Sequence, residues 1–157
     1  MKIAVVDDSK FTRMVIKQIL NDLSNTDFCW EAENGKVALE KNTRDPVDLI
    51  ISDLEMPVLD GLQLLKTVIG GEAETKCLLI SAFHKSNQPK IIDALKAGAI
   101  GFIEKNSLGK GFDINSLKKE IDKYINFLTQ DNILKKEIRA TSLENQFSKS
   151  VVNNRFV

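Results

Sequence analysis

The chain has 157 residues, of which 43% are apolar and 28% charged, a composition typical of one ordinary globular domain with its own core. Its 22 Lys and Arg residues equal its 22 Asp and Glu residues, so no overall charge draws it toward nucleic acid or a membrane surface. It has no apolar run of the ~20 residues that a membrane helix needs and no small-residue cleavage site near its start, so we expect a cytoplasmic protein.

Five apolar runs alternate with five segments of helical periodicity over the first 128 residues. Each run is short and bounded by polar residues, as in strands that a parallel sheet buries on both faces. In the segments that follow, apolar residues recur every three to four positions, as in helices that lie on a sheet. This alternation predicts an α/β fold with a doubly wound, five-stranded parallel sheet, five helices and right-handed crossovers. The strands are expected at 2–7, 28–32, 49–53, 77–80 and 100–103, and the helices near 10–23, 36–42, 62–69, 87–97 and 117–128.

Short polar signals mark the ends of these helices. Ser9 is a candidate N-cap, Asp60–Gly61 is expected to form a turn and a cap, and Gly70–Gly71 and Gly98 end helices. We expect the helices to face the sheet through their periodic apolar residues. These are Phe11, Val15, Ile16, Ile19, Leu20 and Leu23, then Leu62, Leu64, Leu65, Val68 and Ile69, then Ile91, Ile92 and Leu95, and finally Leu117, Ile121, Tyr124, Ile125 and Leu128.

Residues 129–157 have a different character. Thr129 or Asp131 could cap a further helix, in which Ile133, Leu134 and Ile138 are the only regular apolar positions. Beyond Leu128 five basic residues face three acidic ones, a surplus of +2. We therefore expect a solvated extension, partly helical or disordered, and we hypothesise that it mediates dimerisation or contact with a partner.

Polar side chains follow four of the predicted strands. Asp7–Asp8 follow the first, Asp53 the third, Ser81 the fourth and Lys105 the fifth. Ligands of open α/β sheets bind beyond the carboxyl ends of the strands, where these groups would meet. Three neighbouring carboxylates repel one another, and a divalent cation such as Mg²⁺ or a nearby ammonium relieves that repulsion. A carboxylate in such a place can also act as a nucleophile toward a phosphoryl group.

In these strand-end residues the sequence resembles the CheY-like receiver domain of two-component response regulators. The matching segments are Asp7–Asp8, Ala32–Gly35, Asp53–Gly61, Ser81–Ala82 and Ala97–Lys105. The resemblance covers residues 1–128 and leaves 129–157 as a C-terminal extension. It implies the flavodoxin-like strand order 2-1-3-4-5.

The resemblance also implies a role for each acidic residue. Asp53 would accept a phosphoryl group from a phosphohistidine on a sensor histidine kinase or a histidine phosphotransfer protein. Asp8, Asp53 and the backbone carbonyl of Glu55 would hold Mg²⁺, and Asp7 would act largely through water. In this view the chain is a phosphoacceptor with self-catalysed transfer and dephosphorylation, and not an enzyme that turns over an external substrate.

Three further residues would transmit the signal. Lys105 would pair with Asp53 at rest and with the phosphoryl group after transfer. Ser81 would bond another phosphoryl oxygen, and Phe102 would move inward as the aromatic switch. A downstream protein effector would dock on the face of the fourth helix, fifth strand and fifth helix. A homodimer belongs to the hypothesis for residues 129–157.

The sequence departs from the family at several positions. Asn106 follows Lys105, where family members usually have Pro, and Phe102 lacks the hydroxyl group of a Tyr. Glu55 and Phe83 occupy positions, two residues after Asp53 and Ser81, that tune dephosphorylation in the family. The single histidine, His84, is expected in a surface loop.

Other functions fit parts of the sequence. Asp53-Leu54-Glu55 resembles the acidic motif of Mg²⁺-dependent phosphohydrolases, but those enzymes place it on the first strand and add a substrate cap. FMN binding needs a Ser/Thr/Gly-rich phosphate loop where this chain has Asp7–Asp8. DNA binding through 129–157, or a receiver-like binding module without phosphorylation, are the remaining alternatives. Because 29 residues cannot hold an output domain, we expect a single-domain regulator or the N-terminal piece of a larger protein.

Overall fold

The computed structural model describes residues 1–105 and 113–155, with side chains up to residue 150. The loop expected at 106–112, including Asn106, lies outside the described residues. Strands and helices alternate as predicted, and the element bounds agree with the expected ones to within a few residues up to the last helix. In chain order they are β1 (Lys2–Val6), α1 (Lys10–Asp22), β2 (Asp27–Ala32), α2 (Gly35–Arg44), β3 (Leu49–Ser52), α3 (Gly61–Ile69), β4 (Lys76–Ser81), α4 (Gln88–Ala97), β5 (Gly101–Glu104) and α5 (Ile114–Arg155).

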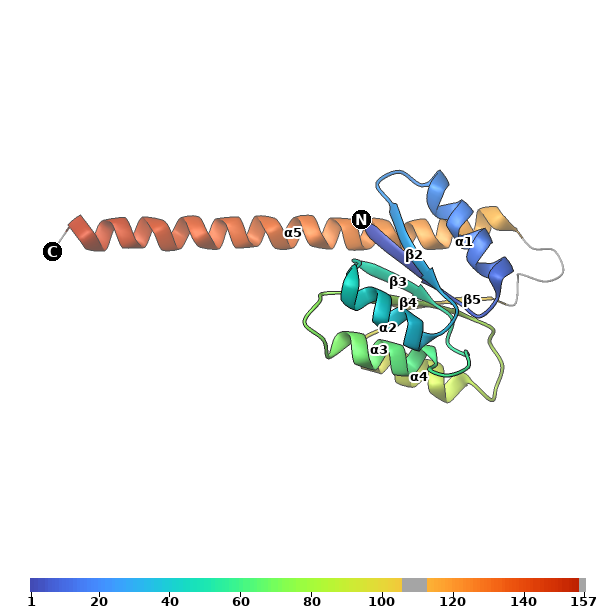
Figure 1. Cartoon of the computed structure of the whole chain (residues 1–157). Helices are drawn as coiled ribbons and strands as arrows, with labels where there is room; N and C mark the ends of the chain where they lie inside the picture. Colours follow the sequence, from blue (N-terminus) through green and yellow to red (C-terminus); the bar gives the residue numbers. More distant parts are fainter. Residues whose placement is uncertain (106–112, 156–157) are drawn as a thin grey trace. The chain divides into compact units, whose positions relative to one another are not determined.

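The five strands form one parallel sheet in the order β2-β1-β3-β4-β5 (Figure 1). Near the carboxyl end of β1, Val6 pairs with Ala32 of β2 on one side and with Ser52 of β3 on the other. The predicted flavodoxin-like order is therefore confirmed. In this order the chain leaves β1 for one edge and returns past it to β3, so the ends of β1 and β3 lie at the topological switch point where such folds bind ligands.

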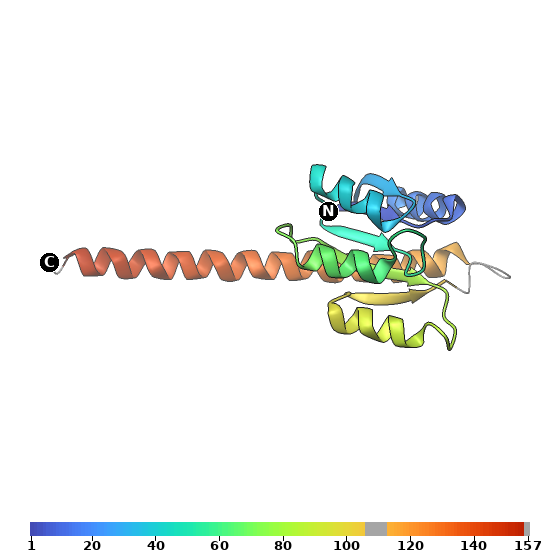
Figure 2. The same ribbon diagram turned by 60° about the horizontal axis from the view of Figure 1, so that its bottom comes forward.

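One main core forms between the sheet and α2, α3 and α4, which lie side by side along it in Figure 2. Alternate residues of the central strands, such as Ala4, Ile50 and Leu79, face this core and are fully buried. Leu64 and Leu65 of α3 are also fully buried, as the periodicity of that helix predicts. The apolar runs of the sequence thus form strands whose side chains are buried because helices cover the sheet.

Four residues that we expected to face the sheet are exposed instead. In α4, Ile91 and Ala94 are buried, whereas Ile92 and Leu95 remain 43% and 42% exposed. Phe11 in the first turn of α1 and Ile69 at the last residue of α3 are also exposed. A short helix on a sheet buries only a narrow stripe, so apolar residues one position round the helix or beyond its ends stay at the surface.

The end of the chain also differs from the prediction. A single helix runs from Ile114 to Arg155, and no second helix begins at Thr129 or Asp131. Thr129 instead donates a hydrogen bond from its hydroxyl to the carbonyl of Ile125 at 2.8 Å, within one continuous helix. The residues of 129–155 are helical rather than disordered. Among the described residues, no helix combines the length and the apolar character that a membrane span requires.

The chain divides into two compact units, Met1–Glu120 and Ile121–Val157. The first unit contains the whole sheet and α1 to α4. In the second unit the predicted apolar positions Ile121, Ile125 and Leu128 are buried, and residues 132–150 are exposed without interruption.

Asp60 and Gly61 hold the start of α3 close to the end of β3. Asp60 forms a capping box with Gln63, which confirms the predicted cap. The Gly61 N–H donates to the carbonyl of Leu54 at 2.9 Å. A Cβ atom on Gly61 would lie 2.2 Å from the backbone carbonyl oxygen of Asp53, so only glycine allows this approach.

We expect Gly61→Ala to lower the free energy of unfolding by about 1–3 kcal/mol, because the added methyl group displaces the backbone at Asp53. Urea denaturation measures this loss. Gly70→Ala is the matched control, since a Cβ there meets its nearest atom at 3.5 Å and the residue has helical dihedral angles. Equal stability of the two variants would contradict the proposed packing.

Candidate functional site

Backbone hydrogen bonds continue past the strand ends and fix the residues of the predicted site. The Asp53 N–H donates to the carbonyl of Val6 at 2.8 Å, and the Lys105 N–H donates to the carbonyl of Ser81 at 2.7 Å. The N–H of Asp7 is bound to the end of β2 at 3.1 Å. Each residue is therefore the first position after its strand and keeps the rigidity of the sheet.

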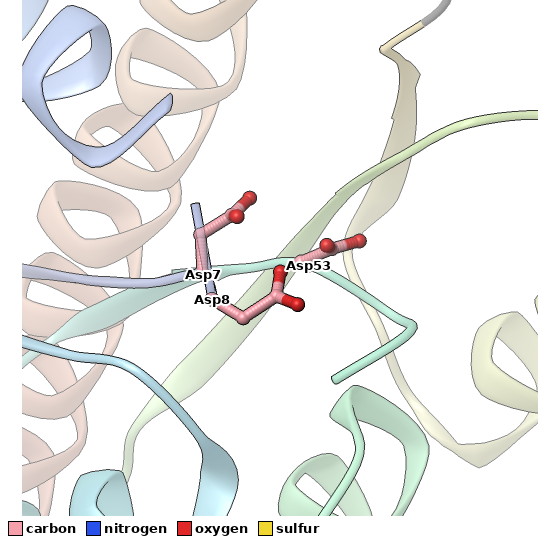
Figure 3. A group of neighbouring side chains, drawn as sticks. All are labelled: Asp7, Asp8 and Asp53. Atoms are coloured by element: carbon pink, nitrogen blue, oxygen red, sulfur yellow. The ribbon is translucent and has the colours of Figure 1, made fainter. Parts of the chain in front are cut away.

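Three carboxylates meet at this edge, as the strand ends predict. One carboxylate oxygen from each of Asp7, Asp8 and Asp53 can be chosen so that all three atoms lie within 4.8 Å of one another. Asp7 and Asp8 leave the end of β1 and Asp53 leaves the end of β3 (Figure 3). Asp7 and Asp53 are only 1% and 6% exposed, whereas Asp8 is open to solvent.

Lys105 lies between the two buried carboxylates. Its Nζ is 2.8 Å from Oδ2 of Asp7 and 3.3 Å from Oδ2 of Asp53. The predicted pairing with Asp53 is present, but the shorter contact is with Asp7. One ammonium group thus serves two carboxylates, and Asp8 adds a third negative charge beside them.

Burial and the neighbouring charged groups shift the pKa values of Asp7 and Lys105. Burial raises the pKa of Asp7 above its usual range, although hydrogen bonds from Lys105 and from the Ser9 N–H act in the opposite direction. Burial acts to lower the pKa of Lys105, but its hydrogen bond to Asp7 and the charge of Asp53 outweigh that effect and raise it. The site therefore favours a bound positive charge and tolerates its own carboxylates poorly.

The donor set fits a hard divalent cation. Carboxylate oxygens at this spacing are the ligands that Mg²⁺ prefers, and Mg²⁺ usually keeps several waters besides one or two carboxylates. The exposed Asp8 leaves the site accessible from solvent. Added positive charge would relieve the repulsion that Lys105 alone does not neutralise.

Of the remaining predicted residues, Ser81 and Glu55 lie at or beyond strand ends at the same edge of the sheet, and Phe102 lies within β5. Ser81 is the buried last residue of β4, the strand next to β3. Phe102 of β5 is half-buried and packs against the main core. Glu55 is exposed, and its N–H donates to Oδ1 of Asp53 at 3.4 Å. That the Glu55 carbonyl binds a metal, and that Ser81 and Phe102 move, stay predictions.

Two contacts of the site were not predicted. Arg13 donates to the backbone carbonyl of Asp7 at 2.6 Å and also binds Glu31 of β2. Its position four residues after the N-cap Ser9, on the same side of α1, is the only sequence signal for this contact. His84, which was expected in a surface loop, lies 3.7 Å from the Glu55 carboxylate and links the loops after β3 and β4.

Comparison with known proteins agrees with this geometry. The family model described as the response regulator receiver domain matches residues 3–122. The chemotaxis protein CheY of Bacillus subtilis is 36% identical over 125 residues, which is 80% of this chain and 98% of CheY.

Longer proteins and solved structures are also similar. The protein-glutamate methylesterase/protein-glutamine glutaminase 1 of Syntrophomonas wolfei is 35% identical over 122 residues, or 78% of this chain. The chain spans about a third of that enzyme's length, 34%. A chain in the crystal structure of the P1 domain of CheA3 in complex with CheY6 from R. sphaeroides is 29% identical, with a TM-score of 0.64 and coverage of 80% of this chain and 96% of that chain.

The raised pKa of Asp7 predicts a pH-dependent effect of Asp7→Asn in the presence of a chelator. Above its raised pKa the wild type holds a buried, poorly neutralised carboxylate, so the variant should be the more stable protein at neutral pH. Protonation of Asp7 removes this difference, so the advantage of the variant should shrink as the pH falls toward the ordinary value of 3.8. Urea denaturation between about pH 3 and pH 7 tests this, and an advantage that is independent of pH would contradict it.

Proposed function

The chain belongs to the response regulator receiver family of two-component signal transduction, and we propose that Asp53 accepts a phosphoryl group in a Mg²⁺-dependent reaction and that the chain signals to a partner by a change of conformation. The observation that carries this proposal is the cluster of Asp7, Asp8 and Asp53 with Lys105 at the switch point of the sheet. We take residues 1–128 as the receiver and 129–157 as its extension.

Asp53 is the residue suited to act as the nucleophile. It is the acid at the end of the central strand β3, and backbone bonds fix its position. A carboxylate oxygen of Asp53 attacks the phosphorus atom in line, and the bond from phosphorus to the donor nitrogen or oxygen breaks. The electron pair of that bond leaves with the donor, and Asp53 becomes an acyl phosphate.

The neighbouring residues supply the positive charge that this transfer requires. Asp8, Asp53 and the carbonyl of Glu55 would hold Mg²⁺, with Asp7 acting through water. When bound, this ion neutralises charge on the phosphoryl oxygens. Lys105 is already within 3.3 Å of Asp53, so its ammonium group can follow a phosphoryl oxygen with little movement.

The signal would then pass from Ser81 to the surface. The Ser81 hydroxyl bonds a phosphoryl oxygen, and Phe102 moves inward as Ser81 and the loop after β4 are pulled toward the phosphoryl group. The exposed apolar side chains of Ile92 and Leu95 support an effector site on the face that α4, β5 and α5 are expected to form.

The phosphodonor would be the phosphohistidine of a sensor kinase or a histidine phosphotransfer protein. The complex of the CheA3 P1 domain with CheY6 supports this class of partner. We propose a phosphoacceptor rather than a hydrolase of external phosphomonoesters, because no substrate cap interrupts the short connections between the described strands and helices. This chain matches only about a third of the length of the methylesterase relative, so we do not propose methylesterase activity for it.

Incubation with acetyl phosphate and Mg²⁺ should add one phosphoryl group to the wild type, and intact-mass spectrometry detects it. Asp53→Asn should carry none, whereas Asp60→Asn, which alters a carboxylate of the following loop and keeps a capping side chain, should be modified like the wild type. An adduct on Asp53→Asn would overturn the assignment. If the wild type shows none, beryllofluoride binding separates a short-lived acyl phosphate from a binding module that is not phosphorylated.

Mg²⁺ alone should stabilise the fold, because it binds the native carboxylate cluster and not the unfolded chain. At a Mg²⁺ concentration about ten to thirty times the dissociation constant, the free energy of unfolding should increase by about 1–2 kcal/mol, which is seen as a rise in Tm. Asp8→Asn should lose most of this rise, since Asp8 is exposed and its substitution removes a ligand without disturbing the core. Asp60→Asn should keep it, and an equal rise for both variants would place the ion elsewhere.

A further inference from the structure

The second half of α5 leaves apolar side chains uncovered. Residues 132–150 form more than five turns of helix, and every one of them is exposed. Phe127, Leu134 and Ile138 are each more than half exposed. Helices in proteins owe most of their stability to packing of an apolar face, so a helix of this length without such packing is marginal in water.

Phe127, Leu134 and Ile138 follow the spacing of a two-stranded coiled coil. Steps of seven and four residues place Phe127 and Leu134 at d positions and Ile138 at an a position of successive heptads. Ile at a with Leu at d is the combination that favours two parallel strands, and Asn145 falls at the next a position, where Asn fixes the register. Asp131, at the first a position, is already paired with Lys135 of its own helix at 3.1 Å.

One pair of charges beside this seam is complementary between two copies of the segment. Glu137 and Glu144 occupy g positions, and Lys135 and Lys149 occupy e positions. In a parallel pair each g residue faces the e residue of the next heptad, which places Glu144 opposite Lys149 of the second copy. In an antiparallel pair the g residues would face each other, and the acids would repel.

We propose that residues 127–150 of α5 pair in parallel with the same segment of a second copy of this chain, with Phe127, Leu134 and Ile138 in the seam. The partner on this surface is a second copy of the chain. The same segment supplies both the apolar residues of the seam and the pair of opposite charges, Glu144 and Lys149, that would meet across it. Thr141 and Ser148 at the remaining d positions weaken the seam, so the dimer forms in a concentration-dependent equilibrium.

Sedimentation equilibrium of the full chain over a wide range of concentrations tests the seam. The wild type should approach twice the monomer mass, and Leu134→Lys/Ile138→Lys should raise the dimer dissociation constant by about a hundredfold or more. Leu143→Lys/Phe147→Lys is the matched control, because it adds the same charge at exposed apolar positions of the same helix outside the seam. It should dimerise like the wild type. A monomeric wild type, or a dimer that the control disrupts and the seam variant does not, overturns the proposal.

Charge exchange tests the orientation. Glu144→Lys and Lys149→Glu should each weaken the dimer by about three- to tenfold, and the two together should restore it to within about twofold. In an antiparallel pair Glu144→Lys would leave the dimer unchanged or tighten it, and that result overturns the parallel arrangement. Far-UV circular dichroism, recorded for each variant at a concentration at which it is dimeric, checks that the substitution itself does not remove helix, since the substituted residues are exposed in the single chain.

Discussion

The contact on which the site depends is one ammonium group shared by two buried carboxylates. Lys105 reaches Asp7 and Asp53 from a strand at the far side of the sheet, and neither acid can move away because each follows directly on a strand that is bonded on both sides. The sheet therefore maintains a repulsion that a flexible loop would relax. A site held in this condition gains from each added positive charge and loses from each added negative charge unless a cation accompanies it.

This constraint explains why the surroundings of Asp53 are packed so tightly. Gly61 lets α3 approach the Asp53 carbonyl more closely than any side chain would allow, and the Asp60 capping box fixes the first turn of α3 there. At the end of β1, the Arg13 guanidinium donates a hydrogen bond to the carbonyl of Asp7 and so fixes the backbone there. Because the backbone is fixed on both sides, a change of charge at Asp53 acts on the side chains and loops around it and not on the sheet.

The sequence predicted that these side chains lie close together because few physical choices were open. Parallel strands bring their carboxyl ends to one edge, so the polar residues that follow β1, β3, β4 and β5 had to converge there. The sequence could not show that Lys105 lies closer to Asp7 than to Asp53, since that depends on rotamers inside the pocket. Arg13 was missed for a related reason, because its spacing from Ser9 places it near the start of α1 but does not show which backbone group it will reach.

The failed predictions concern surfaces, and they share one cause. Periodicity shows that a residue is apolar but not whether the chain itself covers it, so Ile92 and Leu95 of α4 were placed inward with Ile91. The prediction for α5 was wrong in another way. Polar residues after Leu128 suggested that the helix ends there, whereas it continues to Arg155. Within the fold, each helix buries only a narrow stripe of apolar residues against the sheet. The apolar residues that remain outside these stripes, on α4 and on α5, are the ones for which contact with another molecule is the available source of stability.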